Sequence, residues 1–359
     1  MLLELIQTSL DKRDRLSRKL SADDWQGVFE AAINQSVASI CLKGMSRLPK
    51  EQQPPEELYW EWYGIATKTQ FQNEILDKRT ADVWKKLHEA GLDAVVLKGQ
   101  GVAQEYDTLA SLRQCGDIDV WVLGGYDKLC EFIQNTIPTD DVAYHRFHYN
   151  MFKDVEVELH HRPTLMRNLI DDCKLAKWYN GFTAKDFVYL KDKGFAVPPA
   201  SFNRIFILTH IYRHFLFEGI GLRQVMDYYY VMHNSECMIQ NEAELLKEFR
   251  LTRFAGAMMW VLHEVFGLDE GKMICPMNEK EGRFVLDEII LTGNFGQTDK
   301  RYRYRHLRKL RQQIAHGTHL LLHYPSEVIW TPIWLLYHKI WKWNKKRKIR
   351  REWKRKRYL

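Results

Sequence analysis

The stretch that decides the fold is LRQCGDIDVWV, residues 112–122. From Asp117 onward its residues alternate between two faces, which predicts a strand with Asp117 and Asp119 on the same face. Two carboxylates about 7 Å apart on a rigid strand can hold hard divalent cations. Gly116, directly before them, lets another group approach the backbone closely. The alternative is an edge strand with a solvated acidic face, and the neighbouring sequence decides between the two.

The composition describes a globular chain with room for two or three domains. Of its 359 residues, 45% are hydrophobic and 28% are charged, which excludes the disordered and fibrous classes. The six cysteines lie far apart without a CxxC pair, so neither a zinc site nor a disulfide framework is predicted. This cysteine usage favours a reducing cytoplasm. The N-terminal residues MLLELI carry an acid where a signal peptide carries basic residues, so export is not expected.

Hydrophobic periodicity places a small α/β core between two helical blocks, so the predicted fold class is α+β. In the first block, Ser21 is expected to cap a helix, and Pro54-Pro55 interrupts the pattern before a long amphipathic stretch from Glu56 to Leu87. The predicted division is an N-terminal helical region (1–90), the α/β core (91–200), a C-terminal helical domain (201–325) and an aromatic helix with a basic tail (326–359).

Within the α/β core the predicted order is strand, helix, strand, helix, strand, strand, which forms a small mixed sheet. The acidic strand is the second strand of this order. The last two strands read as a hairpin around a Lys153-Asp154 turn. The remaining elements are a strand at 94–97, a helix start at 102–106, a helix at 126–135 and the hairpin segments 142–152 and 155–160.

A second acidic strand is predicted within the hairpin, where Glu156, Glu158 and His160 share one face. If this strand pairs beside Asp117 and Asp119, a third carboxylate joins the first two. Three convergent carboxylates repel one another and raise one another's pKa unless cations offset the charge. Two Mg²⁺ ions would do so, and they are what phosphoryl or nucleotidyl transfer needs. Alternation alone leaves open whether Glu156 or Glu158 is the third ligand.

Short motifs occur in a characteristic order around the two acidic strands. They are LKG at 97–99, Tyr106, Arg113, GDID at 116–119, VELH at 157–160, GLR at 221–223 and Asp227. This layout resembles the polymerase-β-like nucleotidyltransferase superfamily and, more narrowly, the bacterial family of uncharacterised nucleotidyltransferases, over roughly residues 90 to 235. The resemblance implies a polymerase-β-like core and two bound Mg²⁺ ions, with Mn²⁺ as an alternative. It also implies that Asp117 and Asp119 bind both metals and that Glu158 binds the one that activates the acceptor.

The turn after the first strand reads KGQG, residues 98–101, and departs from the superfamily's usual Gly-Ser or Gly-Gly form. No hydroxyl directly follows Gly99, which leaves the role of Gln100 open. Backbone N–H groups at the following helix start and the charge of Lys98 are still suited to phosphate. Taken alone, Lys98 would be a surface lysine at the end of a strand. The resemblance implies nucleotide binding by Lys98, Gly99, Arg113, Gly116 and Arg223.

Both arginines of this set have alternative interpretations. Arg113 can either make a bidentate contact with a triphosphate or pair with Asp107 or Glu105 as a loop residue. Arg223 shares a helix face with Asp227, either as a structural pair or as a contact to triphosphate or acceptor.

The block after residue 200 is predicted to be helical. His210 and His214 stand four residues apart, a spacing that zinc enzymes use. Neither an adjacent Glu nor a third ligand accompanies them, so core histidines are expected. Helices are predicted at 203–217, 222–232, 242–264, 279–291, 303–322 and 328–343.

The C-terminal segment combines aromatic and basic residues. Residues 344–359 contain ten Lys or Arg and one acid, which is a net charge of +9 and leaves −2 of the formal +7 for the rest of the chain. The apolar stretch before it is too short to span a bilayer. Three roles are open for 330–359: a packing helix with a solvated tail, a peripheral membrane contact and a nucleic-acid contact. The aromatic stripe comprises Trp330, Ile333, Trp334, Tyr337 and Trp341.

The resulting hypothesis is a cytoplasmic, Mg²⁺-dependent nucleotidyltransferase that moves a nucleoside monophosphate from an NTP to an acceptor and releases pyrophosphate. The acceptor class, whether small molecule, sugar, protein or RNA, is open, as is the base of the NTP. The alternative is a catalytically inactive relative that binds a membrane surface or nucleic acid through its basic C-terminus and serves as a scaffold. Convergence of Asp117, Asp119 and Glu158 in one open cleft would favour the enzyme.

Overall fold

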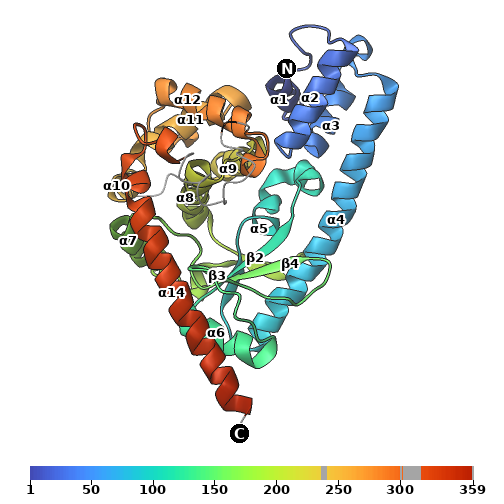
Figure 1. Ribbon diagram of the computed structural model, residues 1–359. Helices are drawn as coiled ribbons and strands as arrows, with labels where there is room; N and C mark the ends of the chain where they lie inside the picture. The colour runs from blue at the N-terminus through green and yellow to red at the C-terminus, as the bar shows by residue number, and fades with distance from the viewer. Residues whose placement is uncertain (236–240, 300, 302–316, 358–359) are drawn as a thin grey trace. The chain divides into compact units, whose positions relative to one another are not determined.

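The computed structural model (Figure 1) describes residues 1–235, 241–299, 301 and 317–357. The chain divides into two compact units. The first unit comprises Met1–Ile75, Val102–Cys115 and Asn203–Gly317, and the second comprises Leu76–Gly101, Gly116–Phe202 and Thr318–Leu359. Most of the helix predicted at 303–322 lies outside the described residues.

The first unit is helical, and its helices begin and end where local chemistry dictates. Ser21 caps α2 as predicted: its hydroxyl accepts from the Asp24 N–H at 3.1 Å, and the Asp24 carboxylate accepts from the Ser21 N–H at 3.0 Å. Helix α4 starts directly after Pro54-Pro55 and runs without a break into the second unit. The helices are α1 (Leu2–Ser9), α2 (Ala22–Asn34), α3 (Ala38–Arg47), α4 (Glu56–Glu89), η2 (Gln104–Leu112), α8 (Ala200–Phe217), α9 (Leu222–Asn234), α10 (Glu242–Glu248), α11 (Thr252–Phe266) and α12 (Glu279–Thr292).

The prediction of a single helix at 242–264 is wrong, because two helices occupy this range. Arg250 has a φ of 56°, a left-handed conformation that ends α10 before α11 begins. Leu246 and Leu251 are both fully buried on either side of this break. The hydrophobic pattern therefore continues through a turn that a periodicity argument does not detect.

The second unit contains a four-stranded mixed sheet with the order β1-β2-β4-β3. Strand β2 is antiparallel to β1 and parallel to β4, and β3 is antiparallel to β4. This arrangement confirms the small mixed sheet and the α+β class, and it satisfies the condition that the two acidic strands pair. The elements of this unit are β1 (Ala94–Val96), α5 (Gln100–Ala103), β2 (Asp117–Val122), α6 (Gly125–Thr136), β3 (Arg146–His148), β4 (Glu156–His160), α7 (Leu169–Tyr179), the pair β5 (Val188–Leu190) and β6 (Phe195–Val197), and α14 (Pro325–Arg357).

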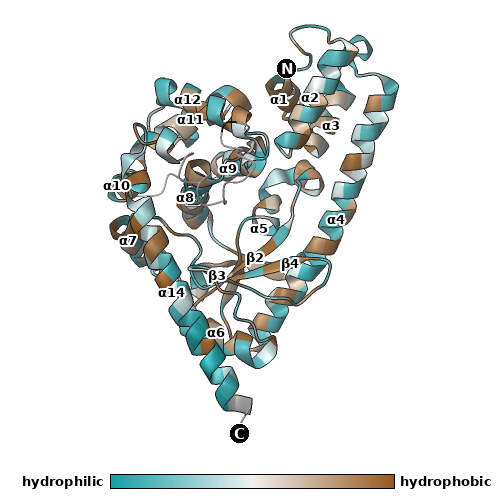
Figure 2. Ribbon diagram, viewed as in Figure 1, coloured by the Kyte–Doolittle hydropathy of each residue, from teal (hydrophilic) through white to brown (hydrophobic). Residues whose placement is uncertain are grey.

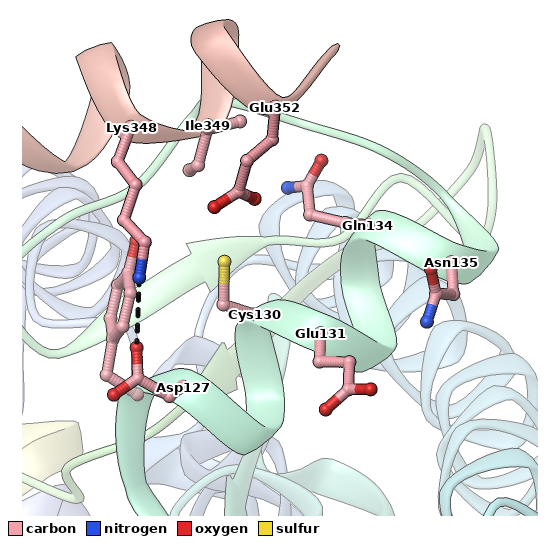
Figure 3. Close-up of a pocket in the computed structure, with 9 residues that line it drawn as sticks. Asp127, Cys130, Glu131, Gln134, Asn135, Lys348, Ile349 and Glu352 are labelled. Atoms are coloured by element: carbon pink, nitrogen blue, oxygen red, sulfur yellow. Dashed lines mark ion pairs between the residues drawn. The ribbon is translucent and has the colours of Figure 1, made fainter. Parts of the chain in front are cut away.

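Helix α14 belongs to this unit and packs on it through aromatic side chains. Trp334 is buried against Tyr144 and Leu165, and Trp341 packs against the same cluster. Farther along, α14 and α6 line a pocket of about 360 Å³, where Lys348 lies 3.8 Å from Asp127 (Figure 3). Among the described residues, no helix has both the length and the apolar content needed to cross a bilayer.

Candidate metal and nucleotide site

The pairing of β2 with β4 aligns the two acidic motifs residue by residue. Asp117 stands opposite Glu156, and Asp119 stands opposite Glu158. Because side chains alternate across a strand and the two strands are parallel neighbours, all four carboxylates lie on one face of the sheet.

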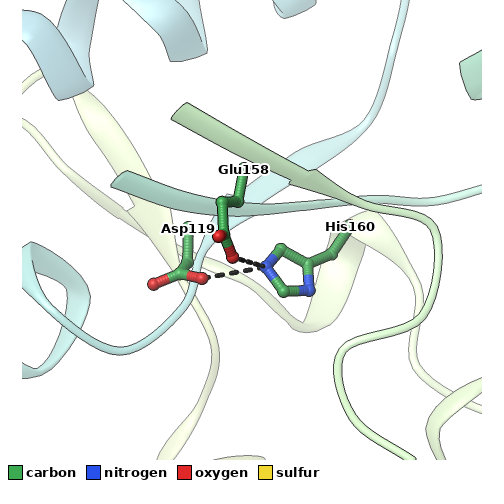
Figure 4. A group of neighbouring side chains, drawn as sticks. All are labelled: Asp119, Glu158 and His160. Carbon is green, nitrogen blue, oxygen red and sulfur yellow. Dashed lines mark hydrogen bonds and ion pairs between the residues drawn. The ribbon is translucent and has the colours of Figure 1, made fainter. Parts of the chain in front are cut away.

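A compact group of ligand atoms forms at Asp119, Glu158 and His160 (Figure 4). One ligand atom from each residue lies within 4.8 Å of the others, and all three side chains are buried. His160 Nε2 donates a hydrogen bond to Asp119 Oδ1 at 2.8 Å and lies 3.6 Å from Glu158 Oε2. The alternation of 156, 158 and 160 predicted His160 on this face, although no role was predicted for it.

Basic side chains balance these carboxylates. Lys98 Nζ lies 3.1 Å from Asp119 Oδ2, and Arg146 on β3 forms an ion pair with Glu158. Burial by itself would raise the pKa of Asp119, but Lys98 and His160 outweigh it and hold the pKa well below its usual range. Asp119 is therefore ionised at neutral pH.

His160 is neutral at the same pH. Burial lowers its pKa below the ordinary value, and the hydrogen bond to Asp119 only partly offsets this effect. The shared hydrogen bond places the proton on Nε2, since Asp119 is the acceptor. Nδ1 is buried and makes no hydrogen bond to any residue in the described ranges.

A second group shares Glu158. It consists of His148, Glu156 and Glu158, and His148 Nδ1 lies 2.8 Å from Glu156 Oε1. Asp117 is partly buried and belongs to neither group. Of the three expected ligands, Asp119 and Glu158 lie together. Asp117 lies two residues away along β2, at a distance of about 7 Å. Two of the three carboxylates named in the enzyme hypothesis therefore lie together, and both are buried rather than in an open cleft.

The turn at Lys98-Gly99 is fixed against β2. The Leu97 N–H donates to the Asp119 carbonyl at 2.9 Å, and Gly99 has a φ of 63°, which favours glycine. A Cβ at Gly101 would stand 2.5 Å from the Val96 carbonyl oxygen, so only glycine fits there. Gln100 is buried and donates to Asp77.

Gly116 lies in the same unit, directly before Asp117. It is exposed, and a Cβ built on it would meet no atom within 4 Å. Space is therefore open beside the first acid of β2, as the close-approach argument requires.

Arg113 belongs to the first unit, where it is buried with Asp227. Its Nε and Nη2 donate to the two oxygens of Asp227 at 2.6 and 2.7 Å, and the Tyr106 hydroxyl donates to Asp227 at 2.6 Å. Asp227, rather than Asp107 or Glu105, is the acidic partner of Arg113 in the described structure. Three of the sequence motifs thus form one buried cluster.

Arg223 also belongs to the first unit. Its Nη1 donates to the Gln114 carbonyl at 2.9 Å, and its side chain is partly buried. Asp227, on the same helix, pairs with Arg113. Earlier in the chain, the rings of His210 and His214 lie 4.4 Å apart and are buried, as expected for core histidines.

Comparison with known proteins adds one finding. Residues 21–267 match a family described as uncharacterised nucleotidyltransferase. The chain belongs to this family. No curated protein and no solved structure matches it. The matched residues include both acidic strands, the Lys98-Gly99 turn and the Arg113–Asp227 pair, whereas α14 lies beyond them.

The donor atoms of the Asp119, Glu158 and His160 group suit a divalent cation. Asp119 and Glu158 offer the carboxylate oxygens that Mg²⁺ prefers. His148 and His160 add imidazole nitrogens, which Mn²⁺ accepts more readily than Mg²⁺ does. Asp119 is ionised, which is the form in which a carboxylate can bind a metal.

Proposed function

We propose that this nucleotidyltransferase moves a nucleoside monophosphate from an NTP to an acceptor and releases pyrophosphate, with Mg²⁺ or Mn²⁺ as its cofactor. Asp117, Asp119 and Glu158 would hold the cation, with His160 beside them. The observation that carries this proposal is the register of β2 against β4, which places the acidic motifs of two parallel strands side by side.

A bound divalent cation would neutralise phosphate charge and lower the pKa of an attacking hydroxyl. The protein's own residues have distinct tasks around it. Lys98, with a partly exposed side chain, supplies a positive charge for phosphate at the end of β1. Gly99 and Gly116 let the nucleotide approach the backbone. His160 orients Asp119 through their hydrogen bond.

The arginines differ in what they can contribute. The guanidinium of Arg113 already donates to both carboxylate oxygens of Asp227. We therefore assign Arg113, with Tyr106, to positioning the buried cluster. Arg223 donates one N–H to the Gln114 carbonyl and has no acidic partner among the residues that the structure describes. Arg223 is therefore the better candidate for a contact with triphosphate or acceptor.

A transfer assay tests the proposal. Each of the four NTPs, labelled at the α-phosphate, is incubated with Mg²⁺, cell extract and the wild-type protein, Asp119→Asn or Asp117→Asn. Labelled product from the wild type and a loss of at least about 100-fold in both variants are expected, because the variants lack a charged ligand. Asp192→Asn, an exposed acid of the same unit, is the matched control.

Equal transfer by the wild type and both variants would contradict the proposed site. Absence of both transfer and Mg²⁺-dependent NTP binding from the wild type would instead favour the scaffold function. The acceptor is identified from the labelled product. A cytoplasmic setting is part of the proposal, and the five cysteines that the structure describes are all free thiols, which supports it.

A further inference from the structure

Helix α14 has one face committed to its own unit. Trp334 and Ile349 are buried, and the Lys345 ammonium lies 3.7 Å from the centre of the Tyr126 ring. Trp353 Nε1 donates to Gln134 Oε1 at 2.5 Å. These contacts run along nearly the whole helix, so α14 is held as a rigid rod with a fixed outer face.

The outer face carries a line of exposed apolar side chains. Its members follow one another at intervals of four, three, four and three residues, and each is between 52% and 63% exposed. This spacing keeps them on one stripe of the helix. The aromatic stripe expected from the sequence mixed the two faces, because Trp334 packs inward whereas Ile333 points outward. The outer stripe consists of Ile329, Ile333, Leu336, Ile340 and Trp343.

The same line continues as basic residues. Arg347 follows Trp343 by four residues, and Arg351 and Lys354 follow at helical spacing; all three are exposed. Arg350 is held by Asp140 at 2.6 Å, but Arg347, Arg351 and Lys354 have no acidic partner within the described part of the chain. Figure 2 shows this change as a shift from mixed colours to teal along α14.

We propose that the outer face of α14 binds the surface of an anionic phospholipid bilayer. A partner for this face must accept aliphatic side chains along one half and positive charge along the other. A bilayer surface offers both, since acyl chains lie directly beneath negatively charged headgroups. A second copy of α14 would place Arg347 and Lys354 against like charges in a parallel pair and against aliphatic side chains in an antiparallel pair. Nucleic acid would leave the aliphatic residues in water.

Vesicle flotation with the full-length protein tests this proposal. The probes are phosphatidylcholine vesicles with and without phosphatidylglycerol. The wild type is expected to float only with the anionic vesicles. Arg347→Gln/Arg351→Gln should lower the partition coefficient by roughly 30-fold, since each basic residue near the surface contributes about 1 kcal/mol. Leu336→Gln/Ile340→Gln should lower it at least about tenfold through lost apolar burial.

Matched controls change the same residue types on α4. Phe71→Gln removes an apolar side chain that is 63% exposed, and Lys68→Gln/Lys78→Gln removes two exposed basic residues. Both controls should float like the wild type. All substituted side chains are exposed. Arg347→Gln/Arg351→Gln retains every apolar contact of α14, so its flotation result remains interpretable even if Leu336→Gln/Ile340→Gln is less stable.

Results of three kinds would overturn the proposal. One is equal flotation with neutral and anionic vesicles, or wild-type flotation by both α14 variants. Another is a dimer in solution that Leu336→Gln/Ile340→Gln dissociates, which would assign the face to a second copy. The third is salt-sensitive binding to RNA or DNA that Leu336→Gln/Ile340→Gln retains and Arg347→Gln/Arg351→Gln loses, without vesicle binding.

Discussion

Glu158 is the residue that both ligand groups share, and it is buried between Arg146 and His160. Glu156 lies on the same face, but its side chain is 60% exposed. We therefore expect Glu158→Gln to weaken Mn²⁺ binding at least about tenfold and Glu156→Gln to weaken it much less, because a lost buried carboxylate leaves fewer charges facing the ion. Calorimetric titration with Mn²⁺ measures both, and a larger effect from Glu156→Gln would reverse the assignment.

His160 is either a metal ligand or only a hydrogen-bond donor to Asp119. Mn²⁺ accepts imidazole nitrogen readily, whereas Mg²⁺ favours oxygen. If His160 is a ligand, His160→Gln should reduce Mn²⁺ affinity by about tenfold or more and Mg²⁺ affinity by far less. The same titration with both metals measures the ratio. Equal losses for the two ions would limit His160 to orienting Asp119.

The pair of Arg113 and Asp227 makes a strong prediction for stability. Asp227→Asn leaves a buried guanidinium without its counter-charge, which should lower the free energy of unfolding by about 3–5 kcal/mol. Denaturant unfolding measures this loss. Asp107→Asn is the control, since Asp107 is exposed and should change the stability by less than about 0.5 kcal/mol. Comparable losses in both variants would show that Arg113 does not depend on Asp227.

At the scale of the element, the packing of α14 on its unit involves two histidines that are neutral in the folded protein. Burial lowers the pKa of His161 to about 3 and that of His338 to about 4. Both rings stack on Trp341, at centroid distances of 6.2 and 6.4 Å. In the unfolded chain both would bind protons near pH 6.5. Their contribution to stability is therefore complete above pH 6.5 and is lost as the pH falls from there toward 4.

We expect the free energy of unfolding to fall between pH 7.5 and about 5. At pH 5 the loss should be about 2 kcal/mol for His161 alone. His161→Asn should flatten the pH dependence. An identical slope in the wild type and His161→Asn would show that another group is responsible.

The sequence predicted the elements of the core better than the contacts between distant segments. Alternation in GDIDVWV and VEVELH predicted both acidic faces, whereas the pairing of the two strands was only a condition of the metal-site hypothesis, and its parallel direction comes from the structure. The break at Arg250 was missed because buried residues continue on both sides of it. Arg113 and Asp227 are 114 residues apart, so only the folded chain reveals their pairing. Which face of α14 packs depends on Tyr144 and Leu165, which its own sequence does not contain.

At the scale of the whole molecule, every predicted metal ligand belongs to the second compact unit. Mn²⁺ at about 100 times its dissociation constant should stabilise that unit by about 2.7 kcal/mol. We therefore expect Mn²⁺ alone to slow amide hydrogen exchange in β2 and β4 but not in α11 or α12. Exchange mass spectrometry with and without Mn²⁺ measures this, and protection confined to the first unit would place the cation elsewhere.

The ion pairs of Lys98 with Asp119 and of Arg146 with Glu158 have a consequence for the order of events at the proposed site. A divalent ion that binds these carboxylates would compete with an internal counterion at each of them. The exchange would release two positive side chains, which then attract a polyanion. Metal and nucleotide would therefore bind with positive cooperativity, each raising the affinity for the other by the same factor. The supply of free divalent ion in the cell would then set how tightly the protein holds its nucleotide.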